Sequence, residues 1–173
     1  MVTLRCTQKL LQRLNVSRRP ALAPPTTVLG DWYANLFFSR PQYVLCMNER
    51  SLLLVIVPAR DLKSLGVRFR DAVVAYLKRI GVPDAAVEAE ARAMSEFAFG
   101  PTANRRLLGC LNEAAFAFSL ECESPRFSSL EDVQMHFAQY IYSTTDYRYP
   151  GELALELFRA AGASAGTAQP RIH

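Results

Sequence analysis

The sequence predicts an α+β fold: an antiparallel sheet with a three-stranded meander, covered by several helices. Three strand-like runs follow one another over residues 32–57, and longer stretches place apolar residues three or four positions apart, as helices do. The chain of 173 residues is half apolar and 21% charged, which is ordinary for a globular protein and excludes wholesale disorder. We therefore expect a single folded domain over residues 1–161 and a flexible, polar tail over residues 162–173.

The expected meander consists of the runs Trp32–Phe38, Tyr43–Met47 and Leu52–Val57. Connections of about four residues separate these runs, and links this short imply hairpins between antiparallel strands. The last run contains six consecutive apolar residues, so we expect an inner strand that is covered on both faces. Two further strands are expected, over Val2–Thr7 and Glu96–Gly100.

Helices are expected between and after the strands. A short helix over Lys9–Leu14 precedes a proline-broken loop, and a longer helix begins near Asp61. The longer helix has one apolar stripe that runs to Ile80, and Gly81 is a favourable residue for ending it. Further helices are expected over residues 83–94, 104–122, 129–141 and 150–161.

The cysteine pattern and the start of the chain indicate a cytoplasmic protein without a metal or a cofactor. The N-terminus lacks the apolar region of a secretory signal, and the longest apolar run of six residues cannot span a bilayer. Thiols stay reduced in the cytoplasm, so we expect Cys6, Cys46, Cys110 and Cys122 to be unpaired. No Cys-x-x-Cys pair occurs, and the histidines are His136 and His173, which excludes the usual zinc-ligand spacings.

Charge is distributed unevenly along the chain. Residues 1–79 contain 13 Lys or Arg against four Asp or Glu, and the first acidic residue is Asp31. This basic N-terminal segment could contact nucleic acid or an acidic protein, and its candidate contacts are Arg5, Lys9, Arg13, Arg18 and Arg19, with Arg105 from a later helix. The alternative is that the segment folds back on the acidic C-terminal half of the same chain.

Two segments are the candidate sites for a ligand. In residues 29–36, Asp31, Tyr33 and Asn35 alternate onto one face of the expected strand and Trp32, Ala34 and Leu36 onto the other. In residues 102–113, Arg105, Gly109 and Asn112 share one stripe of a helix whose first turn offers backbone N–H groups to an anion. The alternatives are an ordinary amphipathic strand and a capped helix in which Gly109 permits close packing against the sheet.

Together these segments resemble an uncharacterised bacterial domain family. The resemblance rests on Arg5-Cys6-Thr7-Gln8-Lys9-Leu10, on Gly30–Leu36 and on Asn104–Asn112, which match an Arg-Cys-Thr-Lys opening, a Trp-x-Ala-Asn strand and an Asn-Arg-x-x-x-Gly-x-x-Asn helix. Gln8 departs from the Lys of that opening. The pattern is more loosely similar to the N-terminal region of plasmid pRiA4b Orf3-like proteins. The resemblance covers roughly residues 2–160 and implies a bacterial cytoplasmic α+β protein, without an established activity, substrate or catalytic residue.

The leading functional hypothesis is a binding module for an anionic ligand, with nucleic acid as the first candidate. Phosphate-binding glycine loops, dinucleotide-binding motifs and the Gly-x-Ser-x-Gly motif of hydrolases are all absent from the sequence. The alternatives are a small enzyme with a polar pocket and a purely structural module that binds a protein partner. The candidate ligand-binding residues come from the three motifs: Arg5, Cys6, Thr7, Lys9, Asp31, Trp32, Asn35, Thr102, Asn104, Arg105 and Asn112.

Overall fold

The computed structural model describes the chain except for residues 17–21, 123–125, 143–146 and 168–173, and except for the side chains of residues 165–167. Its strands are β1 (Val2–Cys6), β2 (Trp32–Phe37), β3 (Tyr43–Asn48), β4 (Leu54–Pro58) and β5 (Phe97–Pro101). Its helices are α1 (Gln8–Arg13), the single turn η1 (Leu62–Ser64), α2 (Leu65–Arg79), α3 (Asp84–Ala93), α4 (Arg105–Glu121), α5 (Leu130–Phe137) and α6 (Pro150–Thr167). These elements confirm the α+β class and lie close to the expected ranges.

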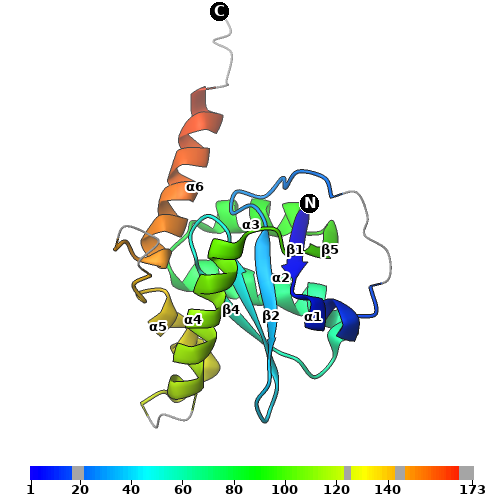
Figure 1. Cartoon of the computed structure of the whole chain (residues 1–173). Coiled ribbons are helices and arrows are strands. Elements are labelled where there is room, and N and C mark those ends of the chain that lie inside the picture. Colours follow the sequence, from blue (N-terminus) through cyan, green and yellow to red (C-terminus); the bar gives the residue numbers. More distant parts are fainter. Residues whose placement is uncertain (17–21, 123–125, 143–146, 168–173) are drawn as a thin grey trace, which may run out of the picture.

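The five strands form one mixed sheet in the order β4–β3–β2–β1–β5 (Figure 1). β2, β3 and β4 are antiparallel neighbours, which confirms the meander. β1 runs parallel to both β2 and β5, so the prediction of an antiparallel sheet is wrong for this half. The physical reason is the connection: the chain leaves β1 through α1 and a long loop, and such a crossover returns it in the same direction.

The run expected to be an inner strand lies at the edge of the sheet. β4 starts at Leu54 and has a single neighbour, β3, so its expected position is wrong. Its expected burial is right, because Val55 and Val57 belong to one hydrophobic core and Leu54 and Ile56 to the other. An edge strand covered on both faces has the same uninterrupted apolar sequence as an inner strand.

Helix α5 covers the open edge of β4. The side-chain oxygen of Gln134 accepts the backbone amide of Ile56 at 2.6 Å, and the Gln134 side chain is itself buried. The backbone carbonyl of Gln134 accepts a hydrogen bond from the hydroxyl of Tyr76 in α2. This second bond connects α5 to α2. A glutamine thus replaces the missing strand at this amide, where an unpaired N–H group would otherwise be buried.

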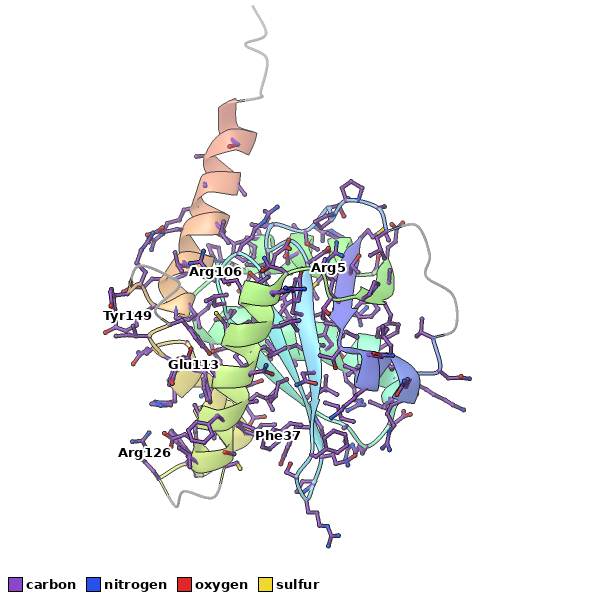
Figure 2. The ribbon with its side chains drawn as sticks, in the orientation of Figure 1. Arg5, Phe37, Arg106, Glu113, Arg126 and Tyr149 are labelled. Carbon is purple, nitrogen blue, oxygen red and sulfur yellow. The ribbon has the colours of Figure 1, made fainter. Side chains whose placement is uncertain are left out.

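The two faces of the sheet are covered by different helices. α4 and α5 lie on one face, called here the α4 face, and α2 and α3 lie on the other, called here the α2 face (Figures 1 and 2). On the α4 face the apolar strand residues come from β2, β3 and β4 and pack against Leu111, Ala114 and Phe118 of α4. This confirms the buried side that the α4 sequence predicts.

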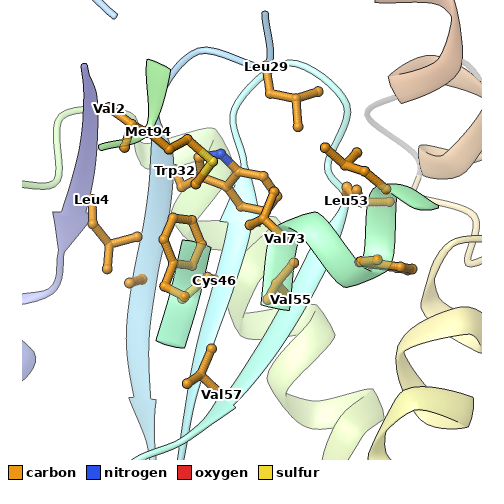
Figure 3. Packing of buried hydrophobic residues seen from close by; sticks show 14 of the residues in the cluster. Val2, Leu4, Leu29, Trp32, Cys46, Leu53, Val55, Val57, Val73 and Met94 are labelled. Atoms are coloured by element: carbon orange, nitrogen blue, oxygen red, sulfur yellow. The ribbon is translucent and has the colours of Figure 1, made fainter. Parts of the chain in front are cut away.

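The larger core lies on the α2 face (Figure 3). Trp32 is buried there, and its ring meets Phe69 of α2 edge-on at 5.2 Å between centroids. Ala34 and Leu36 belong to the same core and Tyr33 to the other, which confirms the alternation expected for β2. The sheet and α2 are therefore joined by alternate residues of the strands, while the other residues face the second helical layer.

Helix ends differ from expectation mainly near the C-terminus. Gly81 follows α2 with φ of +91°, the left-handed conformation that suits a glycine at this position. α5 ends at Phe137 rather than at residue 141, and α6 continues to Thr167 rather than ending at residue 161. α6 projects away from the sheet (Figure 1). Among the helices of the described chain, none combines the length and the apolar character that a membrane span needs.

Replacing Gln134 with Ala is expected to destabilise the protein, because the buried amide of Ile56 would lose its acceptor. An unsatisfied buried polar group costs about 1–3 kcal/mol, so the free energy of unfolding measured in urea should fall by about that amount. Gln139→Ala is the matched control, since Gln139 lies just beyond α5 and is exposed; its effect should stay within about 0.5 kcal/mol. Equal stabilities of the two variants would show that Gln134 does not secure this edge.

Candidate functional site

Part of the α4 face carries polar side chains in place of an apolar core. Thr3 and Arg5 of β1 point to this face, because Val2, Leu4 and Cys6 point to the other. Together with Thr7, Asp31, Tyr33 and Asn35, they form a set called here the polar strip. In Figure 2, Arg5 lies on β1, and β2 lies between this strand and α4.

Asp31 forms the main ion pair of the polar strip. Its Oδ2 accepts from Nε and Nη2 of Arg5 at 2.9 and 2.8 Å, and its Oδ1 accepts the backbone amide of Thr3 at 3.0 Å. The Asp31 side chain is 2% exposed and that of Arg5 is 22% exposed. Because both carboxylate oxygens are hydrogen-bonded to β1, this pair joins β1 to the start of β2.

A second group of predicted site residues meets where β1 and β5 end. The Thr7 hydroxyl donates to Oδ1 of Asn35 at 3.0 Å. Thr102 directly follows Pro101, which lies opposite Cys6, so Thr7 and Thr102 leave neighbouring parallel strands at the same edge of the sheet. Burial raises the pKa of the nearby Tyr33 hydroxyl, while the Arg5 charge and the backbone of Ala103 oppose this rise. The structure therefore brings Arg5, Thr7, Asp31, Asn35 and Thr102 into one region.

Cys6 and Trp32 lie apart from this region. Both side chains point to the α2 face and are buried in its core. Burial raises the pKa of the Cys6 thiol, so the reactive thiolate is disfavoured there. Both residues contribute to packing.

The predicted residues at α4 either cap the helix or face outwards from it. Asn104 caps the helix, and its Oδ1 accepts the amides of Arg106 and Leu107 at 3.0 and 3.2 Å. Arg105 and Asn112 are exposed on the outer side of the helix. Gly109 shares that side, and a β-carbon added to it would meet no atom within 4 Å. The interpretation that Gly109 permits close packing against the sheet is therefore wrong.

Lys9 belongs to a basic surface at the opposite end of β2. Its Nζ lies 5.8 Å from the ring centroid of Phe38, which is 59% exposed. One turn later, Nη2 of Arg13 donates to Oε1 of Gln42 at 3.4 Å. Arg40 lies between Phe38 and Gln42 in the β2–β3 turn.

Arg60 joins the same surface from a third segment. It follows Ala59, whose amide donates to the carbonyl of Gln42 at 2.8 Å. We call Lys9, Arg13, Phe38, Arg40 and Arg60 the hairpin end. Arg18 and Arg19, which the sequence also proposed as contacts, lie outside the described residues. Sequence reasoning missed Phe38, Arg40 and Arg60. The pattern in the sequence that could have indicated a contact surface was a cation and an aromatic residue beside a predicted turn.

A hollow of about 460 Å³ opens beside the hairpin end. Its lining comes from the hairpin and from the C-terminal part of α4: Phe37, Phe38, Ser39, Arg40, Pro41, Tyr43, Ser119 and Cys122. Two other hollows on the described surface measure about 170 and 400 Å³. Lys9, Asn35 and Arg105 line none of these three, so the polar pocket expected of a small enzyme is not formed there by these residues.

Metal-ligand geometry is absent from the described residues, where no three Cys, His, Asp or Glu side chains gather as a metal ion requires. The four cysteines are thiols; Cys6, Cys46 and Cys110 are buried and Cys122 is exposed.

The family described as a domain of unknown function, DUF6933, matches residues 3–153. The chain belongs to this family. Its match includes β2 to β5, all of β1 except Val2, the polar strip and the hairpin end. No curated protein and no solved structure matches the chain.

Removing the Asp31 carboxylate is expected to destabilise the protein strongly. Asp31→Ala leaves Arg5 without its counter-charge and the Thr3 amide without an acceptor, and breaking such a pair costs about 3–5 kcal/mol. The matched control is Asp71→Ala, which breaks the exposed pair with Arg70 and should cost about 0–1 kcal/mol. Similar urea midpoints for the two variants would refute a structural role for the Asp31 pair.

Thiol reactivity should separate the cysteines by burial. In the native protein, maleimide at neutral pH is expected to label Cys122 alone, since burial raises the pKa values of Cys6 and Cys46 and also blocks access. In denaturant without reductant all four thiols should react. Mass spectrometry after digestion gives the sites, and Cys122→Ser should leave the native protein unlabelled. Comparable native labelling at Cys6 would contradict this assignment.

Proposed function

We propose that this protein is a binding module for an anionic partner, with nucleic acid as the first candidate, and that the hairpin end is its contact surface. The observation that supports the proposal is that Lys9 lies over the exposed Phe38 ring, while Arg13, Arg40 and Arg60 are exposed on segments that belong to or contact the same hairpin. Residues 8–30 and 32–48, which supply three of these cations, contain no Asp or Glu. A cluster of Lys and Arg around an aromatic ring suits phosphates together with bases.

The cations of the hairpin end are available to an external anion. Within the described chain Lys9, Arg13, Arg40 and Arg60 form no ion pair, whereas Arg70, Lys78 and Arg92 on α2 and α3 each face a carboxylate within 4 Å. Asp61, which neighbours Arg60, caps η1 by accepting the amide of Lys63 at 3.2 Å. An anion would therefore meet positive charge that the fold itself has not neutralised.

The proposal moves the contact surface from the first thirty residues to the hairpin end. Arg5 is withdrawn from it, because Asp31 already pairs with that guanidinium. The fold-back alternative has no support from Lys9 or Arg13, whose described contacts are with Phe38 and Gln42 rather than with the acidic C-terminal half. The enzyme alternative has less support in the polar strip, since Asp31 is engaged by Arg5 and by the Thr3 amide.

A cytoplasmic location, a bacterial source and the similarity to pRiA4b Orf3-like proteins also belong to this proposal. They derive from the sequence motifs and from the expected reduced state of the cysteines. A cytoplasmic protein would meet nucleic acid as an abundant polyanion.

Replacing Lys9, Arg13, Arg40 and Arg60 with Gln should weaken nucleic-acid binding by an order of magnitude or more at about 50 mM salt, similarly for unrelated sequences. The slope of log Kd against log salt should decrease by roughly 0.7 for each phosphate of a single strand that the variant no longer neutralises. The measurement is fluorescence anisotropy with labelled oligonucleotides over a salt series.

The control variant changes the same net charge elsewhere, at Arg70, Lys78, Arg79 and Arg92. These side chains already face carboxylates of Asp71, Asp84, Asp132 and Glu88, so their removal should leave affinity within about twofold. If the unmodified protein has no measurable affinity for DNA or RNA at 50 mM salt, the proposed function is wrong.

A further inference from the structure

We infer that the hollow beside the hairpin end holds an unstacked nucleobase, and that the protein therefore selects single-stranded over duplex nucleic acid. This inference rests on the proposed function and specifies the form of its ligand. Its occupant is a base of a single strand whose phosphates lie on Lys9, Arg13, Arg40 and Arg60.

The walls of the hollow are aromatic and held in place. Phe37 and Tyr43 lie opposite each other on β2 and β3. Each ring meets the buried ring of Phe118 edge-on, at centroid distances of 5.1 and 5.5 Å. These contacts fix two rings that line the hollow, so a flat aromatic ligand would find a preformed surface.

Phe38 connects the hollow to the cations. Phe38 is one of the residues that line the hollow, it is 59% exposed, and Nζ of Lys9 lies 5.8 Å from the centroid of its ring. Arg40 likewise both lines the hollow and belongs to the basic surface. A nucleotide has the same arrangement, with a flat base joined to a charged phosphate, so one nucleotide can use Phe38 and a neighbouring cation together.

Charge near the hollow also favours an anionic nucleotide. The adjoining hollow of about 170 Å³ shares Tyr43 and Cys122 and contains one carboxylate, Glu121, which Arg126 meets at 3.1 Å. The larger hollow is lined by Arg40 and has no carboxylate in its lining. A volume of about 460 Å³ lies within the range of pockets for small aromatic ligands.

A duplex cannot use this hollow in the same way. Its bases are stacked and paired, so inserting one requires that it first be unstacked. Stacking on an aromatic side chain tolerates every base, and the polar groups of Ser39, Ser119 and Tyr43 are too few for a base-specific pattern. We therefore expect selection for single strands with little preference for sequence.

Phe38→Ala tests the inference with Phe116→Ala as its matched control. Phe116 is 69% exposed on the outer side of α4 and lines none of the three hollows. Loss of one base–aromatic stack should weaken binding of a 12-nucleotide oligothymidine by about 5- to 150-fold. Phe116→Ala should change it less than twofold, Phe38→Trp should retain affinity, and the melting temperatures of Phe38→Ala and Phe116→Ala should agree.

Cys122 provides a second measurement that does not depend on a variant. It is exposed and lines the hollow, so bound oligothymidine should slow its alkylation by maleimide, as read by mass spectrometry. Inorganic polyphosphate supplies the same charge without bases and should slow the reaction less at equal occupancy. Equal protection by both polyanions would overturn the placement of a base in the hollow.

The outcomes separate this inference from the proposed function. Binding of single strands and duplexes with equal affinity, together with an unaffected Phe38→Ala variant, would overturn the inference and leave polyanion binding intact. Absence of binding to either form would overturn both. Binding of polyglutamate but not of oligonucleotides would assign the surface to an acidic protein, which also overturns the inference.

Discussion

The buried carboxylate of Asp31 is the constraint on which the arrangement of this sheet depends. A charge that is 2% exposed must be paired and hydrogen-bonded, and here β1 supplies both the Arg5 guanidinium and the Thr3 amide. The backbone of Asp31 also exchanges hydrogen bonds with Glu49, whose carboxylate accepts its amide at 2.9 Å and whose own amide donates back at 3.1 Å. One residue thus holds β1, the start of β2 and the β3–β4 turn together. The start of β2 therefore has a structural role that its far end does not share.

The start of β2 is structural, and its far end is open to a ligand. At the start, Arg5 and Asp31 pair with each other, so their charges are used within the fold. At the far end, Phe38 is largely exposed with Lys9 over its ring, and the other cations of the hairpin end lie on α1, on the hairpin turn and after β4. Exposed cations contribute little to stability, so a ligand can use them at small cost to the fold. This division explains why Arg5, although basic and close in sequence to Lys9, belongs to a different part of the protein.

Local sequence patterns predicted most elements, because periodicity and breakers act over a few residues. The alternation of β2 and the Gly81 helix end were predicted for this reason. The parallel pairing of β1 was missed, since no local signal states which strand will lie beside it. The edge position of β4 depends on Gln134, which lies 78 residues further along the chain. The hairpin end similarly depends on contacts between segments, such as Lys9 with Phe38, so the sequence predicted basic charge but not where it would gather.

The central claim, that the hairpin end binds a single strand, is tested most directly by NMR mapping with the unmodified protein. Titration with a 12-nucleotide oligothymidine should shift backbone amide signals of α1, of residues 37–43 and of Arg60, and the side-chain amide of Gln42, whose Oε1 accepts from Arg13. Signals of α3 and α6, which lie away from the hairpin (Figure 1), should stay in place. Shifts confined to α3 or α6, or spread evenly over every exposed cation, would contradict the account.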